Sequence, residues 1–191
     1  MRPLLLTLAL VLALPLTAHG VVGVGLTRLG SLFLRPNQVL ECGDGVTDGK
    51  YLKSHQNGKK RVRGECAGGL ATGDWKAWHD TGKKQWSVEF TGGRPTGDYK
   101  AWYADGTLMA KGEYDADGKT GSWTYWWPNG EKREKGNYTK DTPDGCWSTW
   151  HESGDRASKQ GWTAGEKTGK WLEWDREGTK KKSIFGGSGP C

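Results

Sequence analysis

Glycine and aromatic positions recur along this chain with a step of 24 residues, and polar residues fill the intervals between them. One glycine series with this step is Gly49, Gly73, Gly97, Gly121, Gly145 and Gly169. A second series is Gly58, Gly82, Gly106, Gly130, Gly154 and Gly178. A fixed period of this length is typical of repeat proteins in which each unit is one supersecondary element. The pattern therefore predicts six units over residues 49–187.

Each unit carries two aromatic positions after its first glycine. The first position holds Tyr51, Trp75, Tyr99, Trp123, Trp147 and Trp171. The second position, three residues later, holds Trp78, Trp102, Trp126, Trp150 and Trp174, with Ser54 in the first unit. Residues three apart on a regular strand face opposite sides of a sheet, so the two series form separate ladders. We expect the first ladder to pack beside the late aromatic residue of the preceding unit, for example Trp123 beside Tyr114.

Turn signals divide each unit into two strands. Pairs such as Asn57-Gly58 and Asp105-Gly106 accept a positive φ and close β-hairpins. Polar stretches such as residues 115–120 are expected to join one hairpin to the next as loops. Each strand then has about five or six residues. The expected fold class is all-β, a single-layer antiparallel β-meander of six 24-residue hairpin repeats.

The repeat phrase resembles a known family. Residues 121–130 read Gly-x-Trp-x-x-Trp-x-x-x-Gly and continue to Gly-x-Tyr at 136–138, a pattern similar to the MORN-variant repeat. Residues 97–114 carry the same phrase with Tyr99 at the first aromatic position. The array also resembles bacterial YwqK-type antitoxin proteins over about three quarters of the chain. This resemblance implies an elongated MORN-like scaffold for protein or lipid contacts and assigns no catalytic role.

Composition excludes several fold and partner classes. From residue 49 onward there are twenty aromatic side chains but seven Leu, Ile or Val residues, too few aliphatic side chains for a helical bundle or a doubly wound sheet. Lys and Arg outnumber Asp and Glu by 28 to 22, with the charges interspersed. The run Lys180–Lys182 is expected to be a solvated tail, or else a contact with an anionic membrane surface. We expect no nucleic-acid partner.

The N-terminus predicts export. Residues 1–20 read as a signal peptide, with Arg2 before an apolar stretch and small residues before a cleavage point after Gly20. The alternative is an uncleaved membrane anchor over residues 4–26. Both interpretations export the remaining chain to the periplasm, the cell surface or the medium. Residues 21–37 then form a linker.

Four cysteines, Cys42, Cys66, Cys146 and Cys191, fit an exported chain and allow three pairings. Cys42 and Cys66 are one period apart, which suggests a half-repeat or cap over residues 38–48. In an ideal meander they lie about 10 Å apart, beyond the disulfide limit of about 7 Å, unless the end of the sheet is irregular. The tail at 188–191 can return Cys191 to Cys146. We expect the pairs Cys42–Cys66 and Cys146–Cys191, which cap the ends of the array.

No motif indicates catalysis, a metal site or a cofactor. His55, His79 and His151 follow the second aromatic position and, with about 10 Å between adjacent units, are too far apart to share a metal. Serines such as Ser87, Ser122 and Ser148 lack a nucleophile elbow or a paired base. The glycines are too dispersed for a phosphate loop. The sequence therefore predicts a non-enzymatic protein.

The function predicted from these patterns is an exported repeat scaffold that binds a protein or cell-envelope component. One alternative is a toxin–antitoxin or immunity protein of the YwqK type, and another is a glycan-binding or membrane-surface module. The candidate binding residues are the second ladder, Trp78, Trp102, Trp126, Trp150 and Trp174. These tryptophans either form a ligand strip or pack against one another and against Lys and Arg side chains. The oligomeric state is not indicated.

Overall fold

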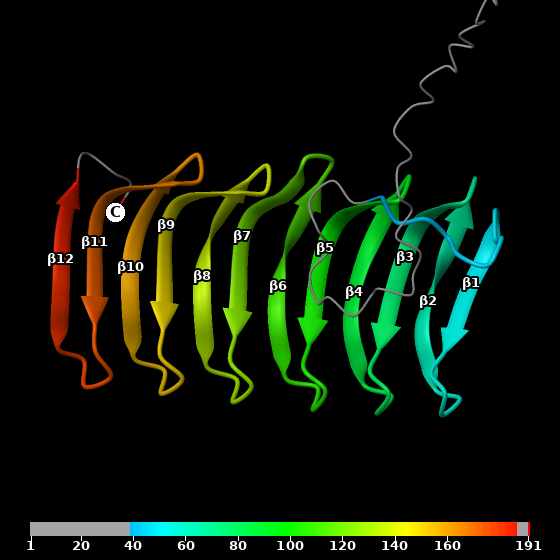
Figure 1. The fold of residues 1–191 in the computed structure, drawn as a ribbon, viewed down its shortest axis with the longest axis horizontal. Helices are drawn as coiled ribbons and strands as arrows, with labels where there is room; N and C mark the ends of the chain where they lie inside the picture. Colours follow the sequence, from blue (N-terminus) through cyan, green and yellow to red (C-terminus); the bar gives the residue numbers. More distant parts are fainter. Residues whose placement is uncertain (1–38, 187–190) are drawn as a thin grey trace, which may run out of the picture.

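The computed structural model describes residues 39–186 and residue 191, and the ordered part is one sheet of 12 antiparallel strands in chain order (Figure 1). The strands are β1 (Gly49–Ser54), β2 (Lys60–Ala67), β3 (Leu70–Trp78), β4 (Lys84–Thr91), β5 (Arg94–Trp102), β6 (Leu108–Asp115), β7 (Gly118–Trp126), β8 (Lys132–Thr139), β9 (Thr142–Trp150), β10 (Arg156–Thr163), β11 (Glu166–Trp174) and β12 (Lys180–Gly186). The all-β meander of hairpin repeats is confirmed. Among the described residues, no helix is long and apolar enough to cross a membrane. The signal, anchor and linker predictions fall outside the described residues.

One end of every hairpin closes with the glycine turn expected from the sequence. In the β3–β4 hairpin the His79 amide donates to the Lys83 carbonyl at 2.9 Å, and the Gly82 amide donates to the His79 carbonyl at 2.8 Å. Gly82 has a φ of 91°, a left-handed conformation that glycine adopts without steric cost. This arrangement recurs with the 24-residue step, so the turns keep all six hairpins in the same register.

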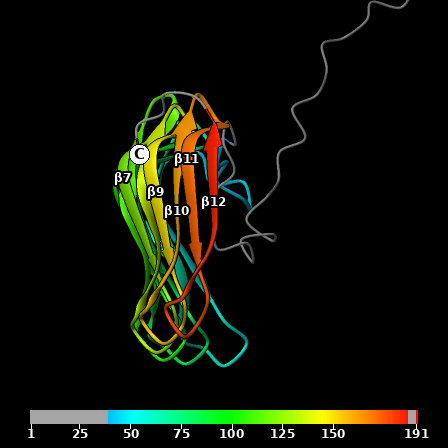
Figure 2. The same cartoon turned by 90° about the vertical axis from the view of Figure 1, so that its left-hand side faces the viewer.

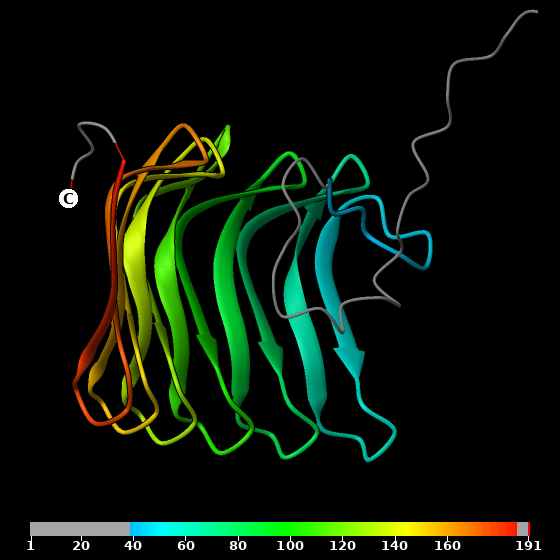
Figure 3. The ribbon, with the colours of Figure 1, turned by 60° about the vertical axis from the view of Figure 1, so that its left-hand side comes forward.

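The opposite end of each hairpin differs from the expectation. Residues 115–120 are mostly strand rather than loop, because β6 continues to Asp115 and β7 begins at Gly118. Pairing continues past a bulge, where the register passes from Lys111 opposite Thr124 to Glu113 opposite Thr120. Gly121 stands in this bulge with a φ of 61°. Bulges bend strands, so the pairs extend around a bend, and most strands reach eight or nine residues. Figures 2 and 3 show the resulting curvature along the strands.

A tryptophan lies flat on a glycine at this bulge. Gly112 has no side chain, and a Cβ there would overlap the ring of Trp123. The indole Nε1 of Trp123 donates to the Glu113 carbonyl at 3.2 Å, a carbonyl beside the bulge. The same arrangement joins Gly64 to Trp75 and Gly136 to Trp147. Each pair links one hairpin to the next, because the glycine and the tryptophan belong to adjacent units.

The buried aromatic side chains form one continuous core on this face of the sheet, which we call the core face. Trp123 is fully buried, and its ring centroid lies 5.1 Å from that of Tyr114 and 5.5 Å from that of Tyr99. The predicted packing of the first ladder against the late aromatic residues is therefore confirmed. In the β4–β5 unit Val88 replaces the glycine and the smaller Tyr99 replaces the tryptophan. A larger residue on one strand is thus paired with a smaller ring on the next.

Residues 39–48 form a cap before β1, in which Glu41 makes an isolated bridge to Leu70. The Leu40 amide donates to the Gly93 carbonyl at 2.7 Å, and the Ala71 amide donates to the Leu40 carbonyl at 3.0 Å. These bonds carry the segment across the loop ends of β2–β5, while β1 pairs with β2. Leu40, at 2% exposure, covers the core at that end.

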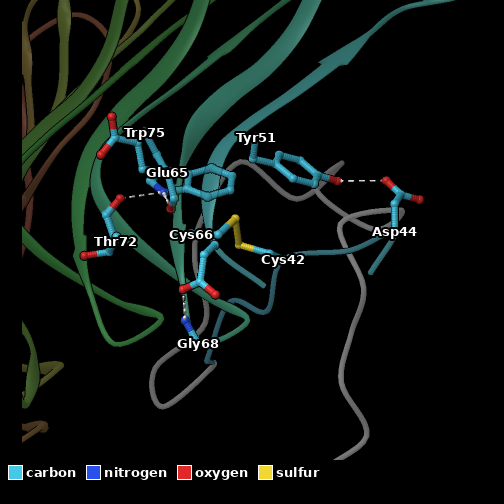
Figure 4. The surroundings of a disulfide bond; sticks show 9 residues. Cys42, Asp44, Tyr51, Glu65, Cys66, Gly68, Thr72 and Trp75 are labelled. Carbon is cyan, nitrogen blue, oxygen red and sulfur yellow. Dashed lines mark hydrogen bonds between the residues drawn. A yellow bond between two sulfur atoms is a disulfide. The ribbon is translucent and has the colours of Figure 1, made fainter. Parts of the chain in front are cut away.

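Both expected disulfides are present. Cys42 and Cys66 are joined with their Cα atoms 6.3 Å apart, because the cap crosses the sheet end instead of extending it (Figure 4). Nearby, the Tyr51 hydroxyl donates to the Asp44 carboxylate at 3.4 Å, which fixes the cap to β1. Cys146 and Cys191 are joined with their Cα atoms 5.5 Å apart. The disulfides therefore tie both chain ends of the array to the sheet.

Replacing Gly112 by Val should destabilise the protein, because the added atoms overlap Trp123. We expect a loss of about 2 kcal/mol or more in the free energy of unfolding, the cost of overpacking a rigid core. The double variant G112V/W123Y copies the natural pair Val88 and Tyr99 and should recover most of the loss. Urea unfolding of the three proteins measures both effects. Equal stability of G112V and the natural protein would contradict the contact.

Alkaline pH should unfold the array through its buried tyrosines. Burial raises the pKa values of Tyr99, Tyr114 and Tyr125 above the ordinary value. Their contribution to the free energy of unfolding is complete below about pH 10, where the tyrosines are protonated in both the folded and the unfolded state. It is lost as pH rises further, because the tyrosines of the unfolded state ionise first. Each tyrosine should lower the unfolding free energy by up to about 1.4 kcal/mol per pH unit. Urea unfolding above about pH 10 should therefore show a steep fall in the free energy of unfolding with pH, and the fall should be shallower in Y99F. The same dependence on pH in Y99F and the natural protein would refute this.

Candidate binding surface

The second tryptophan ladder lies on the face opposite the core, which we call the outer face. On β7 the buried Trp123 and Tyr125 point to the core face, and the alternating Thr124 and Trp126 point outward. All five tryptophans of the ladder are half-buried: Trp78, Trp102, Trp126, Trp150 and Trp174. They therefore add no volume to the core, and each presents part of its ring to solvent.

Cations alternate with these tryptophans across the sheet. We call the alternating series the Trp row: Lys60, Trp78, Lys84, Trp102, Leu108, Trp126, Lys132, Trp150, Arg156, Trp174 and Lys180. The Lys84 ammonium lies 5.7 Å from the Trp102 ring centroid, and the Lys132 ammonium lies 5.9 Å from that of Trp150. Such contacts contribute about 0.5–1 kcal/mol at exposed sites. This packing matches the structural interpretation of the ladder, and a ligand on it stays a prediction.

A second series of basic side chains runs parallel to the Trp row. Cross-strand pairing places its members side by side, and we call it the central row: Arg63, Lys76, Ser87, Lys100, Lys111, Thr124, Lys135, Ser148 and Lys159. Lys100 stands directly opposite Lys111, and Arg63 directly opposite Lys76. Like charges at directly opposite positions destabilise a sheet. The sequence analysis missed these residues, although Lys111, Lys135 and Lys159 recur with the 24-residue step.

Acidic residues accompany only one half of the central row. A third row, on the other side of the central row, carries Glu65, Asp74, Glu89, Asp98 and Glu113 on β2–β6. The corresponding positions on β7–β10 are Ser122, Asn137, Cys146 and Gly161, and Asp144 is the acid that remains in this row. Lys76 lies 3.7 Å from Asp74, whereas Lys135 and Lys159 have no ion-pair partner among the described residues. The outer face is therefore most strongly positive over β7–β10.

The three histidines link adjacent units through hydrogen bonds to backbone carbonyls. His55, His79 and His151 each donate from Nε2 to the backbone carbonyl of the second tryptophan of the next unit, over 2.8, 2.9 and 3.1 Å. Tyr103 and Trp127 make the equivalent bond in their units. Within residues 39–186 and 191, no three His, Cys, Asp or Glu side chains are grouped as a metal site. The histidines thus stabilise the stacking of the hairpins.

The core face becomes polar toward β8–β10. Glu134 and Thr149 occupy positions that hold Trp86 and Ala101 in an earlier unit. A cavity of about 540 Å³ lies there, lined in part by Trp127, Arg133, Glu134, Thr149, His151 and Glu152. The Arg133 guanidinium lies 3.2 Å from the Glu134 carboxylate and 5.6 Å from the Trp127 ring. Arg133 and Glu134 in this cavity are therefore already paired with each other.

Two further lysine groups are parts of the fold. Burial lowers the pKa of Lys119, whose ammonium lies 4.6 Å from the Trp123 ring and 3.1 Å from the Tyr125 hydroxyl. The run at 180–182 lies in β12 and not in a tail, which corrects the prediction. Lys181 lies 2.9 Å from Asp175, and this hydrogen-bonded lysine lowers the pKa of the Asp175 carboxyl. Lys119 and Lys181 are therefore engaged by contacts within the fold.

Comparison with known proteins agrees with the repeat geometry. No curated protein sequence is significantly similar to the chain. A solved structure titled as a glycosylation associate protein (Gap123) complex from Streptococcus agalactiae is 13% identical, with a TM-score of 0.29, and the match covers 61% of this chain and 19% of that one. Residues 95–116 and 119–140 match the family described as the MORN repeat variant. The chain therefore contains MORN-variant repeats in two adjacent units.

Proposed function

We propose that this protein is a non-catalytic repeat scaffold that holds a macromolecular partner, a protein or a cell-envelope component, on its outer face. The observation that carries the proposal is the Trp row, a series of half-buried indoles and cations that crosses the sheet without contributing to the core. Aromatic and basic side chains are enriched where proteins bind partners. The array repeats this chemistry along its length, which suits an extended partner.

The absence of catalysis is part of the proposal. Among the described residues, His55, His79 and His151 are occupied by bonds to backbone carbonyls, so none is placed as a general base for a serine. Ser87 and Ser148 lie within the central row between basic side chains. Their surroundings favour contact with an anionic group over nucleophilic attack.

Export to an oxidising compartment is the setting we propose for this scaffold. Two disulfides, Cys42–Cys66 and Cys146–Cys191, are expected in such compartments and uncommon in the cytosol. The apolar stretch over residues 4–16 supports the same setting through its resemblance to a signal peptide. A cell-envelope component is then available as a partner.

An antitoxin or immunity role is the second candidate. It rests on the resemblance to YwqK-type proteins together with the two MORN-variant units. In that case a toxin would be the protein held on the outer face. A gene for a secreted toxin beside this gene would favour immunity, whereas an envelope gene would favour the scaffold role.

The double variant W102A/W126A tests the outer face as the contact surface. These two tryptophans flank Leu108, the one position of the Trp row where an apolar residue replaces a cation, so they form its most apolar part. We expect the variant to lose retention in the cell-envelope fraction while its unfolding free energy falls by less than about 2 kcal/mol.

The matched control is W123A, which removes a core tryptophan and should cost about 3 kcal/mol or more. Retention of W102A/W126A in the cell-envelope fraction at the level of the natural protein would contradict the proposal. A fall in stability as large as that of W123A would assign the two tryptophans to the fold instead.

A further inference from the structure

The basic half of the outer face points to a particular class of partner, and this inference rests on the proposed function. We infer that the outer face of β7–β10 binds a linear acidic polysaccharide. Its binding residues are Lys132, Lys135, Arg156 and Lys159, together with Trp126 and Trp150 and the hydroxyls of Thr124 and Ser148.

The charge arrangement requires an anion. Lys132 and Lys135 lie on β8, and Arg156 and Lys159 lie on β10, two strands away. Strands are about 4.8 Å apart, so a polymer that crosses them meets a pair of cations roughly every 10 Å. Most acids of this half are placed elsewhere: Glu131, Glu152 and Asp155 are in the turns, and Glu134 is on the core face. Asp144, opposite Asn137, is the acid that stays on the outer face of these strands. A negatively charged chain therefore gains attraction here with little opposing charge.

The other half of the same face shows what a purely structural arrangement would look like. On β3 and β5, Lys76 and Lys100 each have an outward acid two residues earlier in the strand, Asp74 and Asp98. Those acids offset the lysines within the strand itself. On β8 the corresponding neighbour of Lys135 is Asn137, and on β10 that of Lys159 is Gly161. Acids are thus missing beside the lysines in one half of the array and present in the other, which departs from the repeat. Local departures from a repeated pattern are expected at functional sites.

Three features favour a polysaccharide over a bilayer or a nucleic acid. A bilayer contact needs apolar side chains that insert, yet Leu52, on β1 at the far end of the array, is the exposed large hydrophobic residue of the described chain. Nucleic-acid channels stack bases on open aromatic rings, whereas Lys132 lies over the Trp150 ring. Thr124 and Ser148 place hydroxyl groups beside the lysines of the central row, and Asn137 places an amide in the neighbouring row, where these groups can exchange hydrogen bonds with sugar hydroxyls.

Calorimetric titration of the mature protein with polygalacturonate tests the inference, with neutral dextran as the uncharged polymer. We expect binding to polygalacturonate, no binding to dextran, and weaker affinity at higher salt. The variant K135Q/K159Q should bind about tenfold more weakly. The matched control K76Q/K100Q removes the same charge from the other half and should lose less than about twofold. Thermal unfolding of both variants verifies that they are folded.

Equal losses in the two variants would overturn the inference, because diffuse charge would then explain the binding. Tighter binding to a single-stranded oligothymidine, or to vesicles of phosphatidylcholine and phosphatidylglycerol in equal parts, would also overturn it. If polygalacturonate fails to bind but W102A/W126A still abolishes envelope retention, the polysaccharide is wrong and the scaffold function stands. If envelope retention is unaffected as well, both proposals fail.

Discussion

The structure depends on one contact, the tryptophan of each hairpin lying on a residue of the preceding hairpin at a bulge. A single hairpin buries too little surface to be stable in water. The contact joins neighbours in two ways: the ring covers a backbone from which a side chain is missing, and the indole N–H satisfies a carbonyl beside the bulge, as for Trp75 with Gly64 and the Glu65 carbonyl. The glycine–tryptophan pair recurs as Gly64–Trp75, Gly112–Trp123 and Gly136–Trp147, and Val88 with Tyr99 takes its place between the second and third units.

This contact also gives the two faces of the sheet different roles, a buried core on one face and a partly exposed surface on the other. The first aromatic series fills the core face, and the three-residue spacing puts the second series outward, where cations cover it. The histidine-to-carbonyl bonds and the two end disulfides hold neighbouring elements together without using outward side chains. The outward positions of the third row, beside the central row, are then free to vary in charge along the array, as they do between β2–β6 and β7–β10.

The period of glycines and aromatics was sufficient to predict the meander, the turns at Gly82 and its equivalents, and the packing of Trp123 beside Tyr114. The bend could not be predicted, because the bulge at Gly121 depends on pairing between strands and not on local sequence. The same limit applied to the cap, whose hydrogen bonds join Leu40 to residues far along the chain. The central row was visible only as scattered lysines, since register decides that Lys100 meets Lys111.

Deletion of one whole unit tests the central claim that stability is the sum of contacts between neighbouring hairpins. Removing residues 121–144 places Gly145 after Thr120, where Gly121 normally stands, and brings Trp147 against Gly112, so the glycine–tryptophan contact is kept. The account predicts a folded five-unit array with an all-β circular dichroism spectrum and a cooperative urea transition of reduced slope, because less surface is exposed on unfolding. An unfolded product, or one whose remaining units show no cooperative transition, would contradict a modular array and indicate a core that needs all six units at once.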